Sequence, residues 1–141
     1  MKESKKPFRK GIKKFCNNII STLNPKCIIL YGSLARGDFN QRSDIDIIVI
    51  SSNLPKDYYQ RATLLFELIE TYDPIEPLGF TPSEFISMIK SRHCTSLFAM
   101  KEGIPLYGED FFIYLKKIHK EIINKYKIVK GHSTWIPQAF E

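Results

Sequence analysis

Two aspartates that stand two positions apart, Asp44 and Asp46, are the side chains best suited to chemistry. They open a run of β-branched residues, and alternate side chains of a strand share a face, so both carboxylates point the same way with Cα atoms about 6.5–7 Å apart. A divalent cation removes both their repulsion and the cost of desolvating them, and oxygen ligands favour Mg²⁺ or Mn²⁺ over zinc. The pattern predicts a metal site; the alternative is a solvated strand end whose charges prevent edge pairing.

A turn before the aspartates is suited to binding phosphate. Gly32 has no Cβ, so backbone N–H groups can approach an anion, and the Ser33 hydroxyl can donate a hydrogen bond. A helix that begins at Leu34 would direct its positive end towards a phosphate, and Arg36 adds a charge-assisted contact. Alone, Gly32-Ser33 is better interpreted as an ordinary strand-to-helix turn. Together with the carboxylates eleven positions after Ser33, it predicts a site for a triphosphate and its metal.

The segment 32–46 resembles the signature of the DNA polymerase β-like nucleotidyltransferases. It reads Gly-Ser-Leu-Ala-Arg-Gly, five further residues and then Ser-Asp-Ile-Asp, which is similar to the family's G-S-x-A-R-G…S-D-x-D. The short length is similar to that of the minimal nucleotidyltransferases (MNT) of archaea and bacteria. The resemblance implies that family's fold: one small α/β (α+β) domain whose central mixed sheet of about three to five strands is flanked by helices.

The resemblance also implies a role for each residue of the motif. Asp44 and Asp46 correspond to the aspartates that bind the catalytic metals. The nucleotide would be bound by the remaining motif residues Gly32, Ser33, Arg36 and Ser43. A third carboxylate on a following strand completes the family's site. Glu76 is its best match here, Asp73 is the rival, and a solvent-exposed loop acid is the alternative interpretation of Glu76.

The activity implied by the resemblance is transfer of a nucleoside monophosphate from an NTP, with ATP as the expected donor, to an acceptor hydroxyl. Similar minimal proteins of prokaryotes pair with a HEPN-domain protein as the antitoxin of a toxin–antitoxin system, so a HEPN-type partner is expected through the resemblance. Two other functions stay open. One is a non-catalytic module that binds a nucleotide or a partner, since Glu76 is one methylene longer than the usual Asp; the other is a basic RNA-binding protein.

Apolar periodicity predicts alternating helices and strands around these motifs. Helical stripes occupy 8–23, 58–72 and 111–122, and shorter helices are expected from the capping box at 81–84 and over 96–102. Strands are expected over 27–31, 44–51, 73–80 and 104–107, the third at a sheet margin because of its prolines. We expect one domain over 1–130, followed by a C-terminal tail over 131–141 that contains Trp135.

Charge and cysteine content narrow the setting of this 141-residue chain. The net charge of +6 equals that of residues 1–14 alone, and a second group of lysines lies between 116 and 130. Such groups are typical of solvated helix faces, and they also attract phosphate-rich partners. No apolar run approaches the roughly 20 residues of a membrane span. Three cysteines without metal-ligand spacing indicate a reducing compartment, so we expect a cytoplasmic protein.

Overall fold

The sheet at the centre of the molecule is mixed and has four strands, in the order β3-β2-β1-β4. The computed structural model describes residues 6–38, 44–126, 128–129 and 136–137, with side chains from residue 8 to 126 inside those ranges. The elements in chain order are α1 Lys6–Leu23, β1 Cys27–Tyr31, α2 Ser33–Arg36, β2 Ile45–Ile50, α3 Tyr58–Glu67, β3 Ile75–Phe80, α4 Pro82–Lys90, α5 Cys94–Glu102, β4 Ile104–Tyr107, α6 Glu109–Tyr126, β5 Ile128–Val129 and β6 Ile136–Pro137.

The strands pair in two ways. β1 runs antiparallel to both β2 and β4, whereas β2 runs parallel to β3, which lies at the sheet edge as its prolines predict. The predicted mixed sheet of three to five strands is therefore confirmed. The separate pair β5 and β6 is antiparallel. Of the tail predicted over 131–141 the structure describes only Ile136–Pro137, and Trp135 lies outside the described residues.

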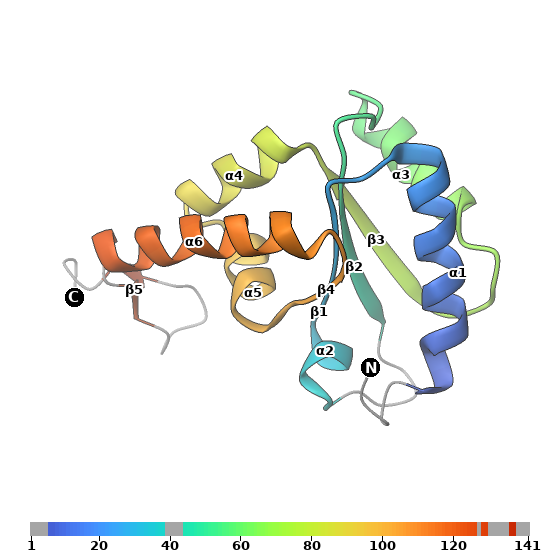
Figure 1. Ribbon diagram of the computed structural model, residues 1–141, viewed down its shortest axis with the longest axis horizontal. Helices are drawn as coiled ribbons and strands as arrows, with labels where there is room; N and C mark the ends of the chain where they lie inside the picture. Colours follow the sequence, from blue (N-terminus) through green and yellow to red (C-terminus); the bar gives the residue numbers. More distant parts are fainter. Residues whose placement is uncertain (1–5, 39–43, 127, 130–135, 138–141) are drawn as a thin grey trace.

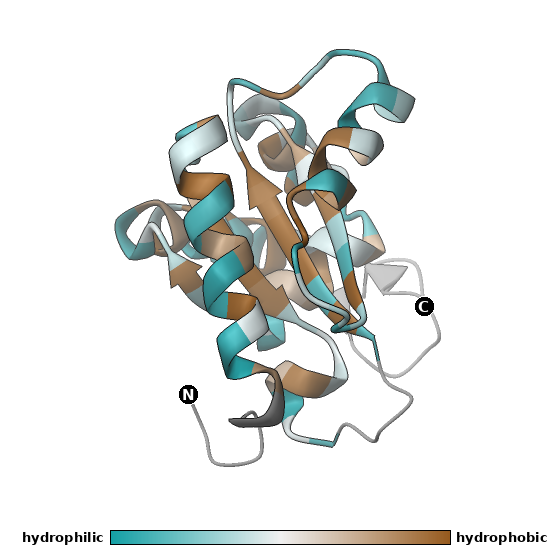
Figure 2. Cartoon of the chain, turned by 90° about the vertical axis from the view of Figure 1, so that its right-hand side faces the viewer, coloured by the Kyte–Doolittle hydropathy of each residue, from teal (hydrophilic) through white to brown (hydrophobic). Residues whose placement is uncertain are grey.

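Helices cover both faces of the sheet (Figure 1). Alternate residues of β1 and β2, such as Leu30 and Ile47, pack with α1 and α3 on one face. Their neighbours, such as Ile29 and Ile48, pack with α4, α5 and α6 on the other face. Because both faces are covered, the central strands are apolar without alternation; they are the brown strands behind α1 in Figure 2. Charged side chains can reach solvent only at the strand ends, where the motif lies.

Helix ends account for the main difference from the sequence prediction. The stripe predicted to continue to residue 72 stops at Glu67, where Leu68 caps α3: the Leu68 N–H donates to the Leu65 carbonyl, and the N–H of Ile69 donates to the Phe66 carbonyl. The Leu68 carbonyl accepts a hydrogen bond from the Asn18 side chain of α1, at 2.9 Å. This contact fixes the end of α3, so Ile69 packs against the core from a loop, whereas Tyr72 is exposed. The extension of this helix to residue 72 was therefore wrong.

The capping box at the start of α4 is confirmed. The Thr81 hydroxyl accepts the N–H of Glu84 at 3.2 Å, and the Glu84 carboxylate accepts the N–H of Thr81 at 2.7 Å. Glu84 also accepts a hydrogen bond from the buried Arg61 of α3, at 2.9 Å. The guanidinium donates further to the carbonyls of Pro55 and Gly79, which ties α3 to β3 and to the start of α4.

His119 makes the stability of the fold sensitive to acid. It is 6% exposed on α6, and its Nε2 has no hydrogen-bond partner among the described residues. Burial, with a smaller contribution from Lys116, lowers its pKa below the ordinary 6.5. The folded state therefore binds this proton less readily than the unfolded state, and stability is lost as the pH falls below about 6.5.

We expect His119→Leu to weaken this pH dependence. The free energy of unfolding of the native protein should fall between pH 7 and pH 5 by up to about 1.4 kcal/mol per pH unit more than that of the variant. Urea unfolding at several pH values measures the difference. Parallel curves for the two proteins would contradict the prediction.

Candidate active site

Three polar side chains form one row across the sheet at the end where the motif lies. Asp46 of β2 is in register with Tyr31 of β1 on one side and with Glu76 of β3 on the other. Residues in register on adjacent strands are about 5 Å apart and share a face. Asp44 immediately precedes β2 and is exposed. The sheet thus brings together residues from three separate parts of the sequence.

The other carboxylates of the site affect the ionisation of Asp46. The pKa of Asp46 is raised, first by its partial burial and then by the negative charges of Asp44 and Glu76, while Arg36 opposes the shift. Burial, together with the charge of Asp46, raises the pKa of Tyr31 to about 12. The site therefore concentrates negative charge that a bound cation would neutralise.

Gly32 brings the phosphate turn against Asp46. Its backbone has φ 80° and ψ −158°, a conformation essentially restricted to glycine. A Cβ built on Gly32 would lie 2.3 Å from the Asp46 Oδ2, so the turn can approach the carboxylate only without a side chain. The predicted helix after the turn begins at Ser33, one residue earlier than expected, and has a single turn that ends at Gly37 in the left-handed conformation.

Arg36, predicted to contact phosphate, forms two ion pairs. Its Nε donates to Asp38 at 3.1 Å, and its Nη1 donates to Glu102 at the end of α5, at 2.9 Å. The guanidinium has five N–H donors, of which these contacts use two. Its charge also reaches Asp46, whose pKa it lowers. Arg36 is therefore close enough to Asp46 to interact with it electrostatically, while its ion pairs are with Asp38 and Glu102.

The two candidates for the third carboxylate lie in different places. Glu76 is in register with Asp46 and raises its pKa. Asp73 accepts a hydrogen bond from Thr71 at 2.7 Å and packs against Gly11 of α1, where a Cβ would lie 1.8 Å from its Oδ2. The geometry therefore favours Glu76, although its role stays a prediction.

The donor set at the site fits a divalent cation in its chemistry. Asp44, Asp46 and Glu76 supply only carboxylate oxygens, which suit Mg²⁺ or Mn²⁺, and the charges of Asp44 and Glu76 disfavour the ionised form of Asp46. Within the described ranges, however, no three His, Cys, Asp or Glu side chains are arranged so that they could hold one metal ion. The metal site stays a prediction, and Ser43, also predicted to bind the nucleotide, lies outside the described residues.

Two residues near the site were not found from the sequence. Tyr31 was assigned only to the core of a strand, although its position next to the glycine turn in sequence was a usable signal. Glu102 was assigned to a helix end, and no local pattern indicates its contact with Arg36, because the two are 66 positions apart. Only the tertiary structure brings α5 to the motif.

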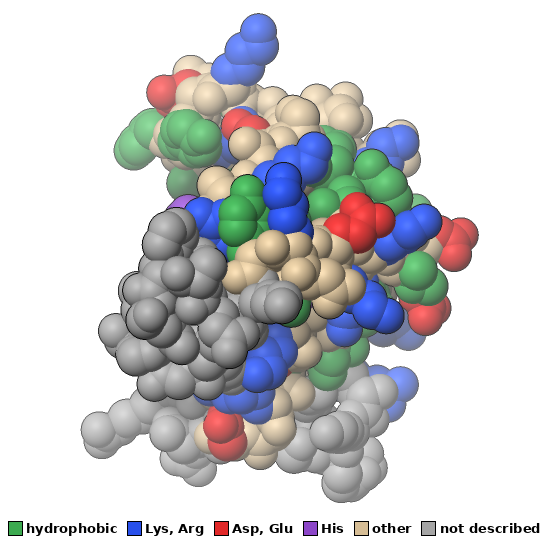
Figure 3. All heavy atoms as spheres, turned by 90° about the vertical axis from the view of Figure 1, so that its left-hand side faces the viewer, with side chains coloured by type: hydrophobic (Ala, Val, Ile, Leu, Met, Phe, Trp, Pro, Cys, Tyr) green, Lys and Arg blue, Asp and Glu red, His purple; other side chains and the backbone are tan. Residues whose placement is uncertain are grey.

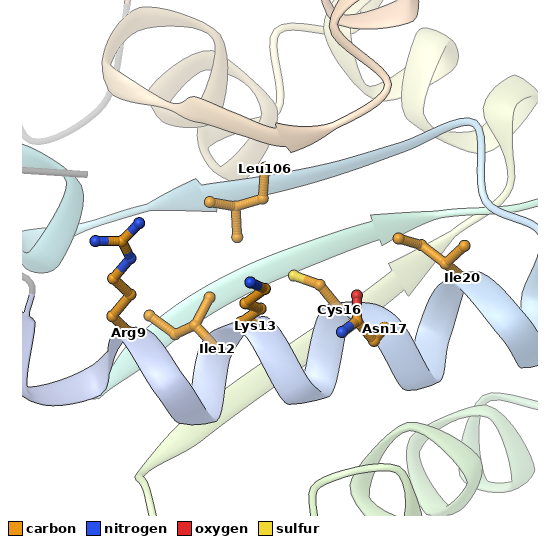
Figure 4. Close-up of a pocket in the computed structure, with 7 residues that line it drawn as sticks. All are labelled: Arg9, Ile12, Lys13, Cys16, Asn17, Ile20 and Leu106. Carbon is orange, nitrogen blue, oxygen red and sulfur yellow. The ribbon is translucent and has the colours of Figure 1, made fainter.

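Hollows elsewhere in the molecule are not lined by the predicted site residues. A cavity of about 350 Å³ lies between α1 and β4 (Figure 4). It is lined by Arg9, Ile12, Lys13, Cys16, Asn17, Ile20 and Leu106. A second, of about 220 Å³, lies between α3 and β3. The predicted site residues Asp46 and Glu76 lie instead at the end of the sheet next to the motif.

Exposed basic residues lie on both α1 and α6. Arg9, Lys10, Lys13 and Lys14 are exposed on α1, and Lys14 pairs with Glu70 at 3.3 Å. On the face shown in Figure 3, Lys and Arg side chains are separated by acidic and apolar ones. This mixture is more typical of a solvated surface than of a nucleic-acid-binding stripe. Of the helices in the described ranges, none is both long and apolar enough to cross a bilayer.

Comparison with known proteins matches most of the chain to one family. The family model described as "Polymerase beta, Nucleotidyltransferase" matches residues 11–112. A protein of Methanocaldococcus jannaschii that carries the provisional name protein adenylyltransferase is 37% identical over 132 residues, which cover 81% of this chain and 87% of that protein.

Solved structures share the fold at lower sequence identity. A provisionally named nucleotidyltransferase from Sulfolobus solfataricus has a TM-score of 0.56 and 20% identity, covering 77% of this chain and 86% of its own. A structure described as a toxin–antitoxin with AMP-PNP has a TM-score of 0.50 and 18% identity, covering 82% and 91%. The arrangement of a mixed four-stranded sheet between helices is therefore that of the nucleotidyltransferase fold.

Proposed function

We propose that this chain transfers a nucleoside monophosphate from an NTP to an acceptor hydroxyl. The proposal proceeds from its family, since the chain belongs to the polymerase beta nucleotidyltransferase family and is a nucleotidyltransferase enzyme. One observation carries the proposal. The Gly32 turn lies so close to Asp46 that a methyl group would not fit between them, and this supports the proposal because the same turn is the one predicted to bind phosphate. In-line attack at the α-phosphorus then releases pyrophosphate.

Each residue of the motif has a place in this proposal. Gly32 and Ser33 bind the phosphates through backbone N–H groups and the serine hydroxyl, and Ser43 is assigned to the nucleotide by the motif alone. Arg36 stabilises the negative charge that develops on the leaving pyrophosphate. The fixed sheet holds these groups in position, so the contribution of the protein is chiefly orientation and electrostatics.

Asp44, Asp46 and Glu76 would hold the divalent cation, with Mg²⁺ or Mn²⁺ as the candidates. Such an ion neutralises phosphate charge and helps to orient the reacting groups when bound. The raised pKa of Asp46 supports the assignment, since burial first and then the negative charges of Asp44 and Glu76 raise it, and the opposing charge of Arg36 does not cancel the shift.

We expect transfer to require the metal. Treatment with EDTA should lower the rate at least about 100-fold, because three carboxylates and a triphosphate repel one another without a cation. Adding Mg²⁺ or Mn²⁺ in excess should restore the rate, measured as release of pyrophosphate. Full activity in EDTA would contradict the metal assignment and leave the fold and the phosphate turn unaffected.

The acceptor is proposed to be a protein, with ATP as the donor. The relative from M. jannaschii carries the name of a protein adenylyltransferase, and the structural neighbour is a toxin–antitoxin with AMP-PNP. A toxin of the HEPN type, as the motif resemblance implies, is the proposed partner.

The described cysteines are free, and burial raises the pKa of Cys16 to about 11, which suits a cytoplasmic setting.

The test is transfer of label from [α-³²P]ATP to a candidate partner. The protein is incubated with the partner, Mg²⁺ and each of the four NTPs in turn, and mass spectrometry measures the added nucleotide. Labelling of the partner by one NTP supports the proposal. Binding of ATP in calorimetry without any labelled product would instead support a non-catalytic module, and affinity for RNA that falls steeply with salt would support an RNA-binding function.

A further inference from the structure

The ion pair between Arg36 and Glu102 joins the motif to a helix that the motif does not include. Its N–O distance is 2.9 Å, and the Glu102 side chain is 15% exposed, whereas that of Arg36 is 44% exposed. Asp38, the other partner of Arg36, is 62% exposed. A less exposed carboxylate is less screened by solvent and holds its partner more firmly than an exposed one. Glu102 is therefore the partner of Arg36 that is less screened by solvent.

Close packing of the helix end fixes the position of Glu102. It is the last residue of α5, and the next residue, Gly103, donates its N–H to the Ala99 carbonyl at 2.8 Å. A Cβ on Gly103 would lie 2.2 Å from that carbonyl oxygen and 2.8 Å from the Ile29 Cγ2. The end of α5 thus packs against β1 at Ile29, two residues before Tyr31, so the sheet determines its position.

We propose that Glu102 is a positioning residue, which holds the Arg36 guanidinium beside the carboxylate row so that its remaining N–H donors meet the phosphates of the nucleotide. The inference rests on the proposed function and adds a residue outside the motif to it. Three N–H donors of Arg36 have no hydrogen bond to any described residue. Without Glu102, the exposed Arg36 side chain would sample many rotamers, and nucleotide binding would have to order it.

Glu102→Gln should raise the KM for the NTP roughly tenfold and leave kcat within about twofold, because an arginine that contacts phosphate loses its preorganisation. Asp38→Asn is the matched control: it removes the exposed carboxylate from the same guanidinium and should change KM by less than about twofold. Calorimetry with a non-hydrolysable ATP analogue measures the same loss of affinity independently of turnover.

A double-mutant cycle tests whether Glu102 acts through Arg36. Arg36→Gln alone should raise KM, and adding Glu102→Gln to it should have no further effect. Additive effects, an unchanged KM in Glu102→Gln, or a lower KM would each overturn the inference. The last result would mean that Glu102 competes with phosphate for Arg36.

The unfolding midpoint and turnover are measured together with KM, so that a loss of stability or a failure of the proposed function can be distinguished from a loss of positioning. If Glu102→Gln lowers the unfolding midpoint, it is compared with Glu102→Asp, which keeps the negative charge. A KM that rises when the charge is lost, whatever the unfolding midpoint of the variant, supports positioning. Wild-type protein that binds the ATP analogue but transfers nothing to any acceptor would contradict the proposed function. The affinities of the variants would still decide the role of Glu102.

Discussion

Asp46→Asn is expected to lower the rate of transfer roughly 10³-fold or more and to leave the fold intact. The substitution keeps the size of the side chain and removes a carboxylate from the centre of the row formed with Tyr31 and Glu76. Loss of one preorganised electrostatic group in a site of this kind costs about 10²–10³-fold in rate, and loss of a metal ligand adds to it. Transfer of label from ATP measures the effect, and Asp44→Asn should behave in the same way.

The stability of Asp46→Asn should move in the opposite direction from its activity. The pKa of Asp46 is raised in the folded state, so its ionised form is disfavoured there, and this penalty is fully present at neutral pH. Without metal, the unfolding midpoint should therefore be unchanged or higher than that of the native protein. Glu121→Gln, at an exposed position on α6, is the control for loss of one acidic charge and should retain activity. Transfer at the native rate by both Asp44→Asn and Asp46→Asn would rule out the proposed function.

Gly32→Ala is expected to reduce transfer at least about 100-fold. Alanine at this position would have to adopt a backbone conformation that is essentially closed to it, and its Cβ would lie 2.3 Å from the Asp46 Oδ2. Either the turn or the carboxylate must move, and a displacement of about 1 Å at a reacting centre costs about 10²-fold. We also expect the free energy of unfolding to fall by about 1–3 kcal/mol.

Gly37→Ala separates the backbone strain from the collision. Gly37 also has a positive φ, of 88°, but no atom of the described residues would lie within 4 Å of a Cβ there. Its ψ of 9° lies in the left-handed region, where alanine costs about 1–2 kcal/mol. Gly37→Ala should therefore lose stability and keep most of its activity. Equal loss of activity in the two variants would show that the contact between Gly32 and Asp46 is unimportant.

Most of the secondary structure was predictable because it follows from local patterns. The two-residue period of Asp44 and Asp46, the Gly-Ser turn and the capping box at Thr81 each lie within a few residues, and the strands over 27–31 and 104–107 match their predicted bounds. The end of α3 was not predictable in this way, because the apolar stripe continues past it and a side chain from α1 decides where it stops.

The site was predictable only as far as its residues are close in sequence. Gly32, Asp44 and Asp46 come from one motif, whereas the placement of Glu76 follows from the parallel register of β2 and β3. The choice between Glu76 and Asp73 could not be made from spacing, since both precede or begin the same strand. The contact of Glu102 with Arg36 depends on how α5 packs against β1, and no pattern in the sequence encodes that packing.

The apolar layers on both sides of β2 restrict how this strand can change in evolution. Ile45 and Ile47 face the layer under α1, while Asp46 shares the opposite face with Ile48. Inserting or deleting one residue would exchange these faces and drive the carboxylate beneath α1. Variants with one residue more or fewer in β2 should therefore lose the fold, and catalysis with it. New acceptor specificities are expected to arise in segments outside this strand.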